Sequence, residues 1–135
     1  DRSRMYPGVP EYFDNDGRGL YSYLTGAASW YMLTMITSVY GVHGELGDLV
    51  IEPALMPQQY NEKGDAKVSL EFAGHGFDIL VHNPDKLEPG DAQVKRALCD
   101  DVKVENVTGN SVRIPRHAIE MLSTDKCHTV EIYIE

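Results

Sequence analysis

The apolar positions of this chain follow two different patterns. From Tyr21 to Tyr40 the sequence reads YSYLTGAASWYMLTMITSVY, and from Ala28 onward large apolar side chains occupy nearly every face of a helical projection. Such a run predicts a helix that is buried on all sides. It is too short, and too interrupted by hydroxyl residues, to span a membrane, which requires about 20 mostly apolar residues. We expect the helix to end at Gly41, because glycine readily takes the left-handed conformation that closes helices.

Beyond residue 45 the pattern changes to a period of two, as in half-buried strands. Strands are expected at residues 49–51, 67–72, 77–82, 93–98, 102–107, 111–115 and 127–134. The second and third of these runs are predicted to form a hairpin that turns around His75. Residues 116–123 are expected to form one helical turn or a loop. Short strands at regular spacing indicate an antiparallel β-sandwich or jelly roll.

The chain is therefore expected to consist of two unlike parts. Residues 1–45 form a loop and one helix, and residues 46–135 form a small all-β unit. A single helix cannot bury an apolar surface that runs around its whole circumference, and the remaining sequence predicts no second long helix. We therefore expect either that the N-terminal part belongs to a larger helical domain, or that the sheet and a partner chain cover the helix.

The segment before the helix carries the chemical candidates. Prolines and glycines in residues 1–20 predict a loop without regular structure. The aromatic and charged side chains of Glu11, Tyr12 and Arg18 are typical of an active-site rim, although a surface loop packed against a parent protein explains them equally well. Thr25 is the predicted N-cap and Gly26 the first helical residue. Free N–H groups and the helix dipole at this entrance favour an anion; a plain capped core helix is the simpler alternative.

Composition excludes several classes of protein. The 135 residues suffice for one domain or for a piece of a larger one, and the first residue, Asp1, suggests a fragment. A net charge of −9 argues against nucleic acid as a partner. Cys99 and Cys127 are far apart and predict reduced thiols in a cytoplasmic protein, with one disulfide as the alternative. The five histidines lack metal-site spacing and are expected in turns or at the surface. No signal peptide or membrane span is evident, so we expect neither metal, cofactor nor membrane.

Four ordered motifs carry a family resemblance. They are YPGVPEYF at residues 6–13, GRG at 17–19, YLTGAASWY at 23–31 and GVHGELGDL at 41–49. Together they resemble the C-terminal region of glycoside hydrolase family 94, which includes the cellobiose, chitobiose, cellodextrin and laminaribiose phosphorylases. The resemblance is specific over residues 6–53 and weaker through the β-rich remainder. It implies that residues 1–45 are the last loop and helix of an (α/α)6 barrel, and that residues 46–135 are the jelly-roll-like C-terminal β-sandwich domain.

The resemblance also implies a reaction. In this family inorganic phosphate attacks the anomeric carbon of a β-linked disaccharide or oligosaccharide, while an aspartic acid protonates the glycosidic oxygen, and a sugar 1-phosphate forms with inversion. The Thr-Gly pair of the family contacts phosphate, which corresponds to Thr25 and Gly26. The general acid lies upstream, so no catalytic residue is expected here and the fragment alone should be inactive. Glu11, Tyr12 and Arg18 match motif positions near the active site without assigned contacts.

Two alternatives to the phosphorylase interpretation remain at this point. The chain can be a non-catalytic carbohydrate-binding β-sandwich that carries a helical arm. It can also be an assembly module whose apolar helix docks a partner subunit. In either case, as for the phosphorylase fragment, the apolar circumference of the helix needs another surface to cover it. A second copy of the chain is the simplest such surface. We therefore expect a homodimer.

Overall fold

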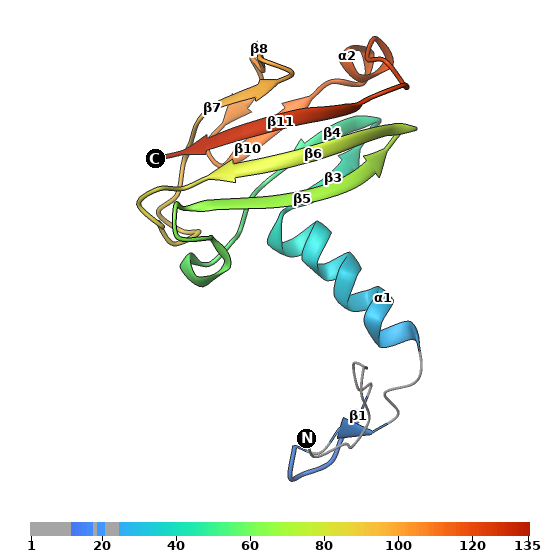
Figure 1. Cartoon of the computed structure of the whole chain (residues 1–135), viewed down its shortest axis with the longest axis vertical. Coiled ribbons are helices and arrows are strands. Elements are labelled where there is room, and N and C mark those ends of the chain that lie inside the picture. Colours follow the sequence, from blue (N-terminus) through green and yellow to red (C-terminus); the bar gives the residue numbers. More distant parts are fainter. Residues whose placement is uncertain (1–11, 18, 21–24) are drawn as a thin grey trace. The chain divides into compact units, whose positions relative to one another are not determined.

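The computed structural model describes residues 12–17, 19–20 and 25–135, which fall into two compact units that divide between Met35 and Ile36 (Figure 1). In the first unit, β1 (Tyr12–Phe13) pairs antiparallel with β2 (Gly19–Leu20). The turn between them is closed by the N–H of Gly17, which donates to the carbonyl of Asp14 at 3.0 Å. The expectation that residues 1–20 hold no regular element is thus wrong, because a short hairpin lies within them.

The helix α1 (Thr25–Thr34) begins one residue earlier than predicted and continues into a π-helical turn, η1 (Met35–Val39). The exposed fractions of its large apolar side chains are 70% for Trp30, 59% for Tyr31, 64% for Met32 and 49% for Leu33. The prediction that this helix is buried on all sides is therefore wrong for the chain by itself. The physical reason is the one the sequence suggested: the only other α-helix among the described residues has five residues and cannot cover it.

Gly41 ends the helical segment, as predicted. Its φ of 67° lies in the left-handed region, and a Cβ at this position would stand 1.9 Å from the carbonyl oxygen of Glu52. Just before it, Tyr40 packs against the core of the second unit and its hydroxyl donates to the carbonyl of Lys67 at 2.8 Å. Residues 36–45, which the sequence grouped with the N-terminal part, thus pack with the β-rich unit.

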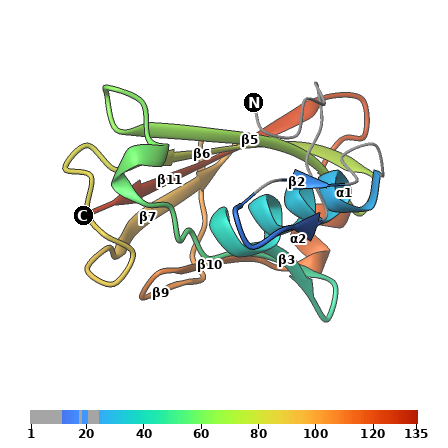
Figure 2. The same cartoon turned by 90° about the horizontal axis from the view of Figure 1, so that it is seen from below.

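The second unit contains two sheets that form separate layers in both views (Figures 1 and 2). Within the described residues the first sheet has the order β3-β4-β10-β9 and the second the order β5-β6-β11-β7-β8. The strands of the first are β3 (Val42–Glu45), β4 (Asp48–Ile51), β9 (Val107–Thr108) and β10 (Ser111–Ile114). Those of the second are β5 (Asp65–Phe72), β6 (His75–His82), β7 (Val94–Cys99), β8 (Val102–Lys103) and β11 (Cys127–Ile134). Two short helices, η2 (Pro57–Gln59) and α2 (Arg116–Glu120), connect strands.

One core lies between the two sheets. Every second residue of β6 and β11 is buried, and the apolar ones among them belong to the same cluster as those from β4 and β10. The largest fully buried apolar side chains from the two sheets are Phe77, Leu49, Ile51, Ile79 and Ile132. Alternation with one face inward is what a two-layer β structure requires. The protein is thus a small α+β fold with two mostly antiparallel sheets, which agrees with the predicted sandwich.

Four details differ from the sequence-based expectation. The central strands β6 and β11 are parallel, whereas a fully antiparallel sheet was predicted. Residues 102–107 do not form one strand: the chain leaves the second sheet after β8 and joins the first at β9. The turn of the β5–β6 hairpin lies at Ala73 and Gly74, both with positive φ, so that His75 is the first residue of a strand. The strand β3 was not predicted at all.

Candidate functional site

The entrance of α1 is the predicted phosphate site. The helix begins at Thr25, the following Gly26 is exposed, and the first turn contains no acidic residue. The first N–H groups of a helix have no partners within it, and the helix dipole adds partial positive charge at this end. An anion approaching Gly26 would therefore meet no carboxylate from this turn. Phosphate binding at Thr25 and Gly26 stays a prediction.

The other predicted residues are distributed differently. Tyr12 lies in β1, where its backbone pairs with Leu20, while Glu11 and Arg18 lie outside the described residues. The structure thus places Thr25 and Gly26 next to each other at the start of a helix. An active-site rim made of Glu11, Tyr12 and Arg18 remains a prediction.

A buried histidine cluster in the second unit was missed by sequence reasoning. His128 is only 1% exposed, and its Nδ1 lies 2.7 Å from a carboxylate oxygen of Asp100. Its Nε2 lies 2.7 Å from the carbonyl of Ser123, which is also 3.3 Å from Nδ1 of His75. The expectation that the histidines occupy turns or the surface is wrong for His75 and His128. The available signal was that His128 shares the apolar phase of its strand with Val130.

The surroundings of Asp100 show what this cluster does. Lys126 donates to one carboxylate oxygen at 2.7 Å and the N–H of Thr129 donates to the other at 2.9 Å. These hydrogen bonds hold the pKa of Asp100 well below its usual range, although burial acts in the opposite direction. Lys126 has the largest effect, and His128 also contributes. The two nitrogens of His128 thus face a carboxylate oxygen of Asp100 and the carbonyl oxygen of Ser123. The cluster links the 123–126 loop to the β7–β8 turn through hydrogen bonds to Asp100.

The outer face of the second sheet carries an aromatic row. The ring of His82 stacks on Tyr133 at 4.7 Å between centroids, and the guanidinium of Arg96 lies 4.0 Å from the same ring. The register places His82 and Arg96 on the two strands that flank Tyr133. Nδ1 of His82 also contacts Asp65 at 2.7 Å. Since Tyr133 is occupied on both sides, this row cannot offer a free aromatic platform to a sugar.

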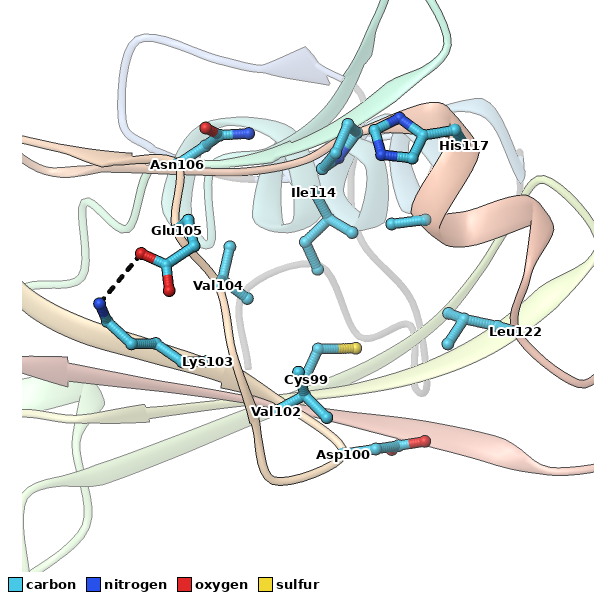
Figure 3. Close-up of a pocket in the computed structure, with 12 residues that line it drawn as sticks. Cys99, Asp100, Val102, Lys103, Val104, Glu105, Asn106, Ile114, His117 and Leu122 are labelled. Carbon is cyan, nitrogen blue, oxygen red and sulfur yellow. Dashed lines mark hydrogen bonds and ion pairs between the residues drawn. The ribbon is translucent and has the colours of Figure 1, made fainter.

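A cavity of about 580 Å³ opens at one end of the second unit (Figure 3). Side chains from β7, β8, β10 and α2 line it, and most of them are apolar. Cys99 is among them, and burial raises the pKa of its thiol. The thiol is therefore protonated near neutral pH and behaves as part of an apolar wall.

Other site chemistry can be stated for the described part of the chain. Both cysteines there are free, and no three His, Cys, Asp or Glu residues are grouped so that they could hold a metal ion. None of the helices that the structure describes has the length and apolar character needed to cross a membrane. No protein-family model matches the chain, and no curated protein matches it.

Proposed function

We propose that the chain is the C-terminal part of a cytoplasmic, inverting β-glycoside phosphorylase. In this proposal residues 1–45 provide the last loop and helix of an (α/α)6 barrel, and residues 46–135 provide the C-terminal β-sandwich domain. The observation that carries the proposal is the helix α1, which begins at Thr25, exposes Gly26 and has no acidic residue in its first turn. The sequence motifs that resemble the phosphorylases include this same pair.

The exposed apolar side chains of α1 support the barrel part of the proposal. Trp30, Tyr31 and Met32 are each more than half exposed. Proteins rarely leave so many large apolar side chains together in water unless another surface covers them. In an (α/α)6 barrel each helix is covered by neighbouring helices, so the all-round apolar character of α1 is what a barrel helix requires.

The proposed task of this chain is to hold phosphate. Thr25 and the first N–H groups of α1 would donate hydrogen bonds to phosphate oxygens, while the positive end of the helix dipole stabilises their charge. Phosphate held in this way would attack the anomeric carbon on the face opposite the leaving sugar. The leaving oxygen takes its proton from an aspartic acid elsewhere in the parent enzyme. Because attack and departure occur on opposite faces, a β-glycoside gives an α-sugar 1-phosphate.

The experiment compares two threonines at opposite ends of one helix. The complete gene product that contains this chain is incubated with β-linked disaccharides and inorganic phosphate, and ³¹P and ¹H NMR detect the sugar 1-phosphate and its anomer. Thr25→Val should lower kcat/KM for phosphate roughly 10- to 100-fold, since a hydrogen bond to a charged group is lost. Thr34→Val makes the same change at the other end of α1 and should leave the rate unchanged.

Two results would overturn the proposal. One is the absence of any phosphorolysis across the β-linked disaccharides by the complete gene product. The other is an equal kcat/KM for the Thr25→Val and Thr34→Val enzymes. Formation of a β-sugar 1-phosphate would retain the phosphorylase class but refute inversion.

The exposed helix also favours a second candidate, an assembly module. In that case α1 docks against another subunit, and a second copy of the chain would make a homodimer. Burial of Trp30 and Tyr31 in such an interface fits the enrichment of these residue types in protein contacts. A chain that stays monomeric at high concentration would count against this candidate.

A further inference from the structure

The cavity in the second unit has a structural cause. Among the residues described, the second sheet has five strands and the first has four. The β7–β8 hairpin forms one edge of the larger, second sheet. Its register places Cys99 opposite the buried Val130 and Val102 opposite Cys99. Cys99 and Val102 therefore continue the inward face of the sheet, but Val102 is 69% exposed. The inward face of this hairpin is apolar and incompletely covered.

Other segments close around this space. Val104 is buried as the chain leaves β8, Ile114 is buried at the end of β10, and Leu122 is partly buried after α2. Figure 3 shows the side chains of Val104, Ile114 and Leu122 directed toward the same volume above Cys99. A hollow with walls from separate segments surrounds a small molecule on several sides, whereas docking of a protein needs a broad, open surface.

Both carboxylates and the lysine at the cavity already have partners. Nζ of Lys103 lies 3.0 Å from a carboxylate oxygen of Glu105 at the rim (Figure 3). The carboxylate of Asp100 is held by Lys126 and His128. A charged ligand would find these groups occupied, so that the loss of its hydration would be costly. The imidazole of His117 is a further polar group of the lining. The neutral amide of Asn106 also lines the cavity and can form hydrogen bonds with an uncharged polar group.

We propose that this cavity is a binding site for a small, uncharged, apolar molecule. Its volume of about 580 Å³ falls in the range of roughly 300 to 1,000 Å³ typical of small-molecule sites. Apolar walls supply the driving force through the burial of apolar surface, and the amide of Asn106 orients one polar group of the ligand. The site is independent of the proposed phosphorylase function, because all of its residues lie in the second unit and binding involves neither phosphate nor sugar.

Indole is a suitable probe, since it is neutral, apolar and carries a single N–H group. The complete chain is titrated with indole, and binding is followed through the methyl resonances of Val104, Ile114 and Leu122 by ¹H–¹³C NMR. We expect saturable shifts at these methyl groups. In a Cys127→Ser background, saturating indole should also slow the alkylation of Cys99 by N-ethylmaleimide. Shifts that do not saturate, or that avoid the cavity methyl groups, would refute the site.

Two variants test the location by independent means. Ala118→Phe fills the cavity from α2, and Val102→Asp places a charge on its exposed floor, where folding should be little affected. Each should weaken indole binding by about tenfold or more. Met121→Asp is the matched control, because Met121 is 84% exposed and lies outside the cavity. If Val102→Asp binds indole as tightly as Met121→Asp does, the proposal is wrong, even where Ala118→Phe fails to fold.

Discussion

The contact between Asp100 and the buried His128 makes a sharp prediction about stability. Asp100→Asn removes the carboxylate charge that faces His128, Lys126 and the N–H of Thr129, while the side chain keeps its shape. Asp100 has a φ of 47° and its neighbour Asp101 a φ of 66°. Asparagine tolerates this left-handed region well, so backbone strain does not enter. Any large loss of stability must therefore come from the lost charge.

The expected magnitude follows from the contacts. The His128–Asp100 bond is 2.7 Å long on a ring that is 1% exposed, and a charge-assisted hydrogen bond of this kind contributes about 1.5–3 kcal/mol. The Lys126–Asp100 pair involves a lysine that is mostly exposed, so it adds at most about 1 kcal/mol. We expect Asp100→Asn to lower the free energy of unfolding by about 2–3 kcal/mol. At a typical urea dependence this moves the unfolding midpoint by about 1–2 M.

The pH dependence of this effect has a definite sign. The pKa of Asp100 is lower in the folded protein than in the unfolded chain. Its contribution is thus fully present above the unfolded pKa of about 3.9 and is lost as the pH falls toward the folded value. The difference in stability between wild type and Asp100→Asn should be largest near neutral pH and should shrink as the pH falls below about 4 toward the folded pKa.

Urea unfolding at several pH values, followed by circular dichroism, measures this difference. Asp101→Asn is the matched control, because it makes the same substitution at the next position of the same turn. We expect it to change the free energy of unfolding by less than about 0.5 kcal/mol. Equal stabilities for the Asp100 and Asp101 variants, or a difference that does not depend on pH, would refute a role for the buried ion pair.

Two further predictions concern glycine and the exposed helix. Gly41→Ala should destabilise the protein by more than about 2 kcal/mol, because the new Cβ would meet the carbonyl of Glu52. Gly74 has a similar φ but open space around it, so Gly74→Ala should cost only about 1 kcal/mol. Equal melting temperatures for the two variants would contradict this prediction. Trp30→Ser should shift a dimer toward monomer in light scattering if α1 forms the subunit contact. Met121→Ser should not, because Met121 lies on the β unit, although it is even more exposed than Trp30. A dimer that survives Trp30→Ser unchanged would place the contact elsewhere.

Sequence patterns predicted most strands because their inward side chains alternate with outward ones. The runs at residues 67–72, 77–82 and 127–134 all lie within observed strands. Alternation identifies the buried face but carries no information on strand direction, which explains why the parallel pairing of β6 and β11 was missed. The strand β3 escaped prediction because Gly44 and Gly47 signalled a boundary, whereas Leu46 and Gly47 in fact form the turn of a hairpin.

The site was predictable only as far as local sequence determines it. The start of a helix at Thr25 follows from residue types next to one another, and it was placed to within one residue. The cavity and the His128–Asp100 pair depend on residues that the fold brings together from different strands, so no local spacing could reveal them. His128 did leave one signal, a polar residue in the apolar phase of its strand, because a buried polar side chain needs a specific partner.

The order of strands in the second sheet has a consequence for synthesis on the ribosome. The strand β11 is the last element along the described chain, yet it lies between β6 and β7 at the middle of its sheet. Until its residues emerge, the nascent chain exposes the inner edges of both neighbouring strands, and such unpaired edges promote aggregation. The second sheet, and with it the core, can therefore close only after the residues of β11 have been synthesised.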